Sequence, residues 1–68
     1  MIVHFEKVGR YALSFDRECK DDLTYEWLAK QVGKHCMSND LDFYYDRETR
    51  KGYILGGFQT IGMFWWEI

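Results

Sequence analysis

The sequence predicts an α+β fold in which a mainly antiparallel β-sheet carries one amphipathic helix on one face. Two observations lead to it. Several short segments alternate apolar and polar residues, as strands with one buried face do. Only the segment at 25–36 spaces its apolar residues at helical intervals instead. The expected order of elements is β-β-α-β-β-β, and a single helix packed on an antiparallel sheet suits that order.

The chain length of 68 residues predicts one domain, residues 1–68. A chain this short buries only about 60% of the surface that its unfolded form exposes. Domains below about 70–80 residues often need a disulfide, a metal or a partner subunit. Aromatic residues make up 19% of the chain, and each buried aromatic removes roughly 150–250 Å² from water. The aromatic content therefore allows a dense core in a small fold.

Two strands are expected before the helix. The first covers residues 2–8, and the second alternates apolar residues between Tyr11 and Phe15. The break at Gly9 fits a hairpin, with a bulged continuous strand as the alternative. The polar residues 16–22 then predict a solvated loop that leads to the helix.

The helix has a clear start. Thr24 is a good N-cap, and Leu23 and Leu28 are spaced to form a hydrophobic staple across it. Glu26 in the first turn suits the helix dipole. We therefore expect a helix at 25–36.

One stripe of this helix is expected to face the core. It consists of Tyr25, Leu28, Ala29, Val32 and Cys36. Trp27 falls on the opposite side, beside Lys30 and Lys34. Gly33 weakens the helix by about 1 kcal/mol relative to alanine.

Three strands are expected after a loop at 37–40. They cover residues 41–47, 53–55 and 58–68, with a polar hairpin loop at 47–52 and a bend at the two glycines 56–57. In the first of these strands, alternation places Tyr44 on the face away from the core.

Large aromatic side chains are expected on both faces of the sheet. Because side chains alternate, one of Trp65 and Trp66 leaves the helix-covered face in either register. Trp27 is a further candidate interface anchor, since tryptophan is frequent among binding hot spots; the alternative is that it folds against a loop or sheet edge. Two or three exposed aromatics present roughly 400 Å² or more, which monomers rarely expose without a purpose. The predicted partner-binding residues are Trp27, Lys30, Lys34, Tyr44, Trp65 and Trp66.

Nucleic-acid binding is the second hypothesis. A basic loop beside tyrosine-bearing strands could combine phosphate contacts with base stacking. Its residues would be Arg47, Arg50, Lys51 and Tyr53. The net charge of −2 and the sequence pI near 5.5 weigh against it, because phosphate neutralisation needs a basic face.

Metal binding and catalysis find little support. The imidazole and thiol groups belong to His4, Cys19, His35 and Cys36, and they lack the short paired spacings of structural zinc sites. His35 and Cys36 are adjacent, so on a helix their side chains point about 100° apart and do not form a nucleophile and base pair. We expect no enzymatic activity, no cofactor and no metal.

The remaining polar groups have simple expected roles. Cys19 and Cys36 flank a helix about 18 Å long, far beyond the roughly 7 Å that a disulfide allows between Cα atoms, so free thiols are expected. Asp40, Asp42 and Asp46 could together hold a hard cation, but no calcium-loop pattern surrounds them. We expect them to decorate a turn and a solvated strand face.

The sequence thus predicts a small non-enzymatic protein-interaction module, either a regulator or inhibitor of a larger partner or a homodimer. The first residues lack the apolar run of a signal peptide, and nowhere do 18 apolar residues occur together. We therefore expect a cytoplasmic protein that does not bind membranes.

Overall fold

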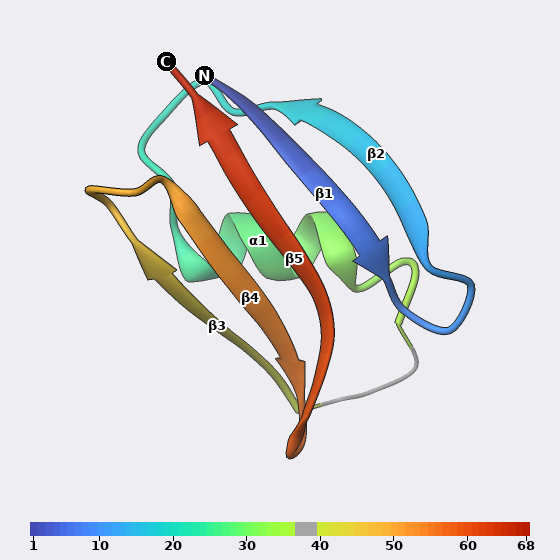
Figure 1. Ribbon diagram of the computed structural model, residues 1–68. Coiled ribbons are helices and arrows are strands. Elements are labelled where there is room, and N and C mark those ends of the chain that lie inside the picture. The colour runs from blue at the N-terminus through green and yellow to red at the C-terminus, as the bar shows by residue number, and fades with distance from the viewer. Residues whose placement is uncertain (37–39) are drawn as a thin grey trace.

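The chain folds into a five-stranded antiparallel sheet with one helix lying across one of its faces (Figure 1). The computed structural model describes residues 1–36 and 40–68, so the predicted loop at 37–40 lies outside the described residues except for Asp40. The elements are β1 (Ile2–Val8), β2 (Leu13–Glu18), α1 (Tyr25–Val32), β3 (Leu41–Asp46), β4 (Lys51–Gly56) and β5 (Gln59–Glu67). The predicted α+β class and the order β-β-α-β-β-β are confirmed.

The strand order in the sheet is β2-β1-β5-β4-β3. Every neighbouring pair is antiparallel. Strands β1 and β5, from the two ends of the chain, lie side by side at the centre of the sheet (Figure 1). Their register places Ile2 opposite Glu67 and His4 opposite Trp65. Residues far apart in the sequence therefore share the middle of both sheet faces.

The hydrophobic core lies between the sheet and α1. Phe5 of β1 and Phe64 of β5 are fully buried, with ring centroids 6.0 Å apart. Leu28 and Val32 of α1 close over them and are also fully buried. The complete set of buried hydrophobic residues is Val3, Phe5, Val8, Cys19, Leu23, Leu28, Val32, Phe43, Ile54, Phe64 and Trp66.

Helix α1 begins at the predicted residue and ends earlier than predicted. The side chain of Thr24 accepts a hydrogen bond from the backbone N–H of Trp27 at 3.2 Å, which confirms the N-cap. The helix stops at Val32 instead of residue 36, and Gly33 is its C-cap. A glycine is a poor helix former, and the next backbone bond, from His35 to the carbonyl of Val32, already makes a tighter turn. Among the described residues, no helix is both long and apolar enough to span a membrane.

The second strand is shifted toward the C-terminus relative to its prediction. Gly9 and Ala12 adopt positive φ angles of 71° and 51° and form a turn, so the predicted hairpin is confirmed but Tyr11 lies in the turn, 79% exposed. Residues 16–18 were expected in a solvated loop, yet they pair with the start of β1. An edge strand tolerates polar side chains on both faces, so backbone pairing decides here and apolar alternation does not.

The side chains on the two flanks of α1 lie differently from the predicted helix faces. A sheet of five strands spaced about 4.8 Å apart is wider than one helix of about 10 Å, so side chains from both flanks reach down to it. Trp27, on the outward side of the predicted helix, is half-buried, with its ring 6.2 Å from that of Phe5, which agrees with the alternative that it folds against a loop or the sheet. Tyr25, expected in the core, is 46% exposed; its ring meets Phe43 edge-on, and its hydroxyl donates to the carbonyl of Leu41.

The two C-terminal tryptophans lie on opposite faces of the sheet. Trp66 is only 6% exposed and packs against Tyr45 and Phe64, at centroid distances of 5.9 and 6.0 Å. Trp65 lies on the face away from α1, next to His4. The prediction that one of the pair leaves the helix-covered face is confirmed. Trp66, however, is a core residue, so Trp65 is the member of the pair that the open face carries.

Candidate functional site

The candidate site is the sheet face away from α1, which we call the open face. Two tyrosines are its most exposed aromatics: Tyr44 on β3 is 63% exposed and Tyr53 on β4 is 55% exposed. Alternation along the strands determines which side chains this face carries. Those that the site involves are His4, Glu6, Asp16, Tyr44, Lys51, Tyr53, Met63, Trp65 and Glu67.

One row of open-face residues crosses four strands. Glu6 of β1 lies opposite Met63 of β5, Met63 lies opposite Tyr53 of β4, and Tyr53 lies opposite Tyr44 of β3. Directly opposed side chains on antiparallel strands have Cβ atoms about 4.5–5.5 Å apart. The row is therefore a continuous strip with two exposed tyrosines at one end and a carboxylate at the other.

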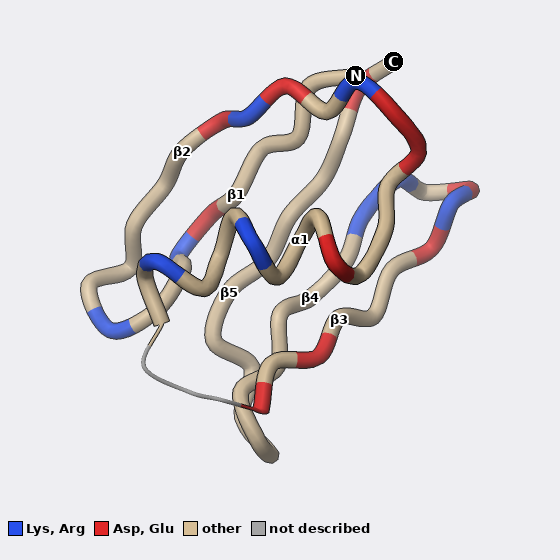
Figure 2. Tube along the Cα trace, turned by 180° about the vertical axis from the view of Figure 1, so that it is seen from behind, with Lys and Arg blue, Asp and Glu red and all other residues tan. Residues whose placement is uncertain are grey.

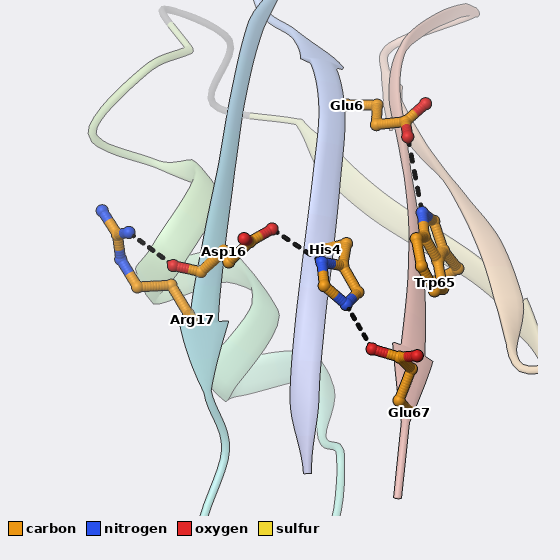
Figure 3. A network of polar contacts seen from close by, with 6 residues as sticks. All are labelled: His4, Glu6, Asp16, Arg17, Trp65 and Glu67. Atoms are coloured by element: carbon orange, nitrogen blue, oxygen red, sulfur yellow. Dashed lines mark hydrogen bonds and ion pairs between the residues drawn. The ribbon is translucent and has the colours of Figure 1, made fainter.

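A second row is centred on Trp65. This residue lies between His4 on β1 and Lys51 on β4. The His4 imidazole stacks on the indole, with centroids 4.1 Å apart and planes inclined by 23°. The indole N–H of Trp65 donates to Oε1 of Glu6 at 3.4 Å, which links the second row to the first (Figure 3).

His4 is held between two carboxylates from the strands on either side of it (Figure 3). Its Nδ1 lies 2.7 Å from Oδ1 of Asp16 on β2, and its Nε2 lies 2.9 Å from Oε2 of Glu67 on β5. Only the doubly protonated ring can donate to both oxygens. The hydrogen bond to Glu67, and then the one to Asp16, raises the pKa of His4 above its ordinary value of 6.5. The cationic ring is also the form that an indole face attracts.

A cavity of about 410 Å³ lies on the β4 side of Trp65. Its lining residues are Glu6, Lys51, Gly52, Tyr53, Met63, Phe64 and Trp65. A second hollow of about 390 Å³, on the side of Tyr44, shares Lys51, Gly52 and Tyr53 with it. Tyr53 therefore stands between two concave regions, and the open face offers shape as well as apolar surface.

The structure separates the predicted partner-binding residues into two groups. Tyr44 and Trp65 lie together on the open face. Trp27, Lys30 and Lys34 belong to α1 and the turn after it, on the other side of the sheet. Trp27 borders a different cavity of about 400 Å³, formed with the segment that follows β2. A single contact surface cannot include both groups.

The predicted basic loop is divided as well. Lys51 lies beside Trp65 on the open face. Arg47 turns toward the helix side, where it donates to the carbonyl of Leu23 at 3.4 Å and covers the Tyr45 ring at 5.7 Å. Figure 2 shows acidic and basic segments alternating along the β3–β4 hairpin, which holds Arg50. The hairpin therefore lacks a uniformly basic edge.

The residues predicted from the sequence did not include Glu6, Met63 or the pairing of His4 with Trp65. Alternation alone places each of these residues on the open face, so that part of the signal was present. What brings them together is the pairing of β1 with β5, which joins segments about sixty residues apart. Hydrophobic alternation carries no information about which strands are neighbours.

Two of the three aspartates considered as a cation site accept backbone hydrogen bonds. Asp42 accepts a hydrogen bond from the backbone N–H of Phe43, and Asp46 accepts one from that of Glu48, both at 2.8 Å. Both cysteines are free thiols. Within residues 1–36 and 40–68, no group of three or more histidine, cysteine or acidic residues is placed to hold a metal ion.

A scan against protein-family models, a search of curated proteins and a search of solved structures each find no match.

Proposed function

We propose that this chain is a small, non-enzymatic protein-interaction module that binds a partner protein through its open face. A second copy of the chain is one possible partner, and a larger protein that the module regulates or inhibits is the other. The observation that supports the proposal is the grouping of Tyr44, Tyr53, Met63 and Trp65 on one helix-free face.

The aromatic residues and the methionine of the face are of the types found in protein interface cores. Tyrosine, tryptophan and methionine are enriched in interface cores, while charged residues are depleted there and occupy the rim. On this sheet, Tyr53, Met63 and Trp65 occupy β4 and β5 near the middle. The carboxylate of Asp16 lies on the outer strand β2. A partner that covers the centre would exclude water from the aromatics and leave that outer carboxylate at the rim.

Nucleic-acid binding remains the alternative, and the electrostatics of the face weigh against it. The open face carries more carboxylates than cations, and Arg47 is turned to the other side of the sheet. Phosphate binding depends on a basic surface and weakens steeply as salt concentration rises. Binding through apolar and aromatic contacts should hardly respond to salt.

Matched variants test the proposal. Tyr44→Ser combined with Tyr53→Ser removes the exposed tyrosines of the open face, and Tyr11→Ser removes a still more exposed tyrosine from the β1–β2 turn. Light scattering over a concentration series measures self-association. Affinity capture from source-cell lysate, followed by mass spectrometry, identifies other partners.

The expected result is an association that the Tyr11→Ser control retains and the double variant loses. If the wild-type chain stays monomeric at high micromolar concentration, and all three proteins capture the same set, the open face has no binding role. Captured material that is nucleic acid, released by moderate salt, would instead support the alternative.

A further inference from the structure

The carboxylate of Glu6, at the edge of the cavity beside Trp65, has few hydrogen-bond donors around it. It is half-buried, and its hydrogen bond from the Trp65 indole is long, at 3.4 Å. Among the described residues, no lysine, arginine or histidine nitrogen lies within ion-pairing distance of it. An ionised carboxylate has about four acceptor positions, so one weak donor leaves most of its capacity unused.

The walls of the same cavity are aromatic. Tyr53 and Trp65 line it together with Met63, which lies opposite Tyr53. His4 covers the side of the indole toward β1, which leaves the side toward β4, where the cavity lies. Aromatic faces attract cations, most strongly where water is excluded. A neutral apolar group would fit the walls but would bury Glu6 without a partner, which is costly.

The charge around the cavity favours a cation. Open-face carboxylates come from four of the five strands, whereas the cations that strand pairing places on this face are Lys51 and, when its ring is protonated, His4. His4 is already matched with Asp16 and Glu67. The carboxylates on this face are Glu6, Asp16, Glu18, Asp42, Asp46 and Glu67. A field of this sign attracts positive groups and slows the approach of negative ones.

We propose that this cavity receives a basic side chain of the partner protein, an arginine or a lysine, which stacks against Trp65 and Tyr53 and donates to Glu6. The inference rests on the proposed function and names the chemistry that the partner brings to the open face. Arginine suits the site best, because its planar guanidinium can stack on a ring while its N–H groups reach a carboxylate.

Lys51 gives the proposal a sharp test because it lines the same cavity with the opposite charge. If the ligand is cationic, removing the Glu6 charge weakens binding and removing the Lys51 charge strengthens it. If the cavity instead takes an anion such as a phosphate, both effects reverse. The two variants Glu6→Gln and Lys51→Gln therefore give opposite signs under either reading.

The probe is N-acetyl-arginine amide, with N-acetyl-citrulline amide as its neutral isostere at matched ionic strength. Backbone and indole N–H shifts in NMR spectra of the folded wild-type chain report binding and need no substitution. We expect the arginine probe to move the Trp65 indole signal and the Tyr53 backbone signal in a saturable way. Citrulline should leave both signals in place.

The variants then test whether Glu6 is the carboxylate that binds the arginine probe. We expect Glu6→Gln to weaken binding of the arginine probe about two- to fivefold, the range of an exposed ion pair. Lys51→Gln should strengthen it by a similar factor. Glu26→Gln, the same change on α1 across the sheet, should have no effect.

Equal responses to arginine and citrulline, or an affinity that Glu6→Gln does not alter, overturn the inference. The inference is also overturned if N-acetyl-phosphoserine amide binds more tightly than the arginine probe and Lys51→Gln abolishes that binding. Failure of this inference can be told apart from failure of the proposed function. If the Tyr44→Ser, Tyr53→Ser double variant loses a partner that Glu6→Gln and excess arginine probe leave bound, the interaction module stands and only its basic ligand is ruled out.

Discussion

His4 and Trp65 stack on the open face of the sheet with ring centroids 4.1 Å apart, although they lie at opposite ends of the chain. The contact exists because β1 pairs with β5. It joins the histidine and its two carboxylates to the wall of the aromatic cavity, so the protonation of His4 bears on both stability and the proposed binding surface.

The stability of the protein should decrease as pH rises past the ordinary pKa of histidine. The folded-state pKa of His4 is raised by Glu67 and Asp16, so folding favours the protonated ring. This contribution is fully present below pH 6.5 and is lost as pH rises through the raised pKa. An NMR titration of the imidazole protons, in a His35→Gln background that leaves one histidine, should give a midpoint above 6.5.

His4→Gln serves as the control. The difference between the urea midpoints of wild type and variant should shrink as the pH rises from 6.5 through the raised pKa of His4. A His4 midpoint at or below 6.5 would show that the two carboxylates do not hold the ring in solution.

Substitutions on α1 and in the turn after it should separate buried from exposed residues. Leu28→Ala leaves a cavity under the helix and should reduce the free energy of unfolding by about 2–5 kcal/mol. Val32→Ala, also fully buried, should be costly for the same reason. Lys30→Ala and Lys34→Ala should change it by about 0.5 kcal/mol or less. Similar urea midpoints for all four variants would show that the face with Leu28 and Val32 is not the one that packs in the core.

Gly52→Ala should be strongly destabilising. A Cβ atom on Gly52 would lie 2.5 Å from the carbonyl oxygen of Tyr44 and 2.6 Å from Cζ of Phe64. Because one neighbour is backbone and the other is core, we expect a loss of about 3 kcal/mol or more, at or above the usual range for overpacking. Thermal or urea unfolding measures the loss.

Gly57→Ala is the matched control in the next turn. It has a positive φ of 66° but open space around its Cβ position, so it should cost only about 1–2 kcal/mol, from backbone strain. An equal or smaller loss for Gly52→Ala would mean that β3 and β4 can separate to admit a methyl group.

The three tryptophans should differ in their access to a quencher. In variants that each retain one tryptophan, Trp66 should show blue-shifted fluorescence that resists acrylamide, because it lies in the core. Trp65 and Trp27 are half-buried and should be quenched more readily. A partner on the open face should protect Trp65 and leave Trp27 unchanged, whereas protection of Trp27 alone would move the contact surface to the helix side.

Thiol titration should count two reactive groups in the unfolded chain without a reducing agent. In the folded chain, Cys36 should react before Cys19, because Cys19 is buried in the core and Cys36 only partly. Burial also raises the pKa of the Cys36 thiol above its ordinary value, so its reaction should accelerate above neutral pH. A count of zero would reveal a disulfide.

The sequence by itself determined the local features of this protein. Period-two alternation predicted five strands, though not the full extent of β2, and put Tyr44 on one face. It also required Trp65 and Trp66 to separate. Thr24 specified the start of α1 through its own side chain. These outcomes depend on interactions between residues a few positions apart, which a sequence pattern records directly.

Only the tertiary structure decided which distant segments meet. The pairing of β1 with β5 brings Glu6 and His4 to Trp65, and the width of the sheet beside one helix draws Trp27 inward. Backbone pairing extends β2 into polar residues that by pattern belong to a loop. Backbone hydrogen bonds are the same for every residue, so the choice of neighbouring strands comes from burying the whole core at once, and no local pattern contains it.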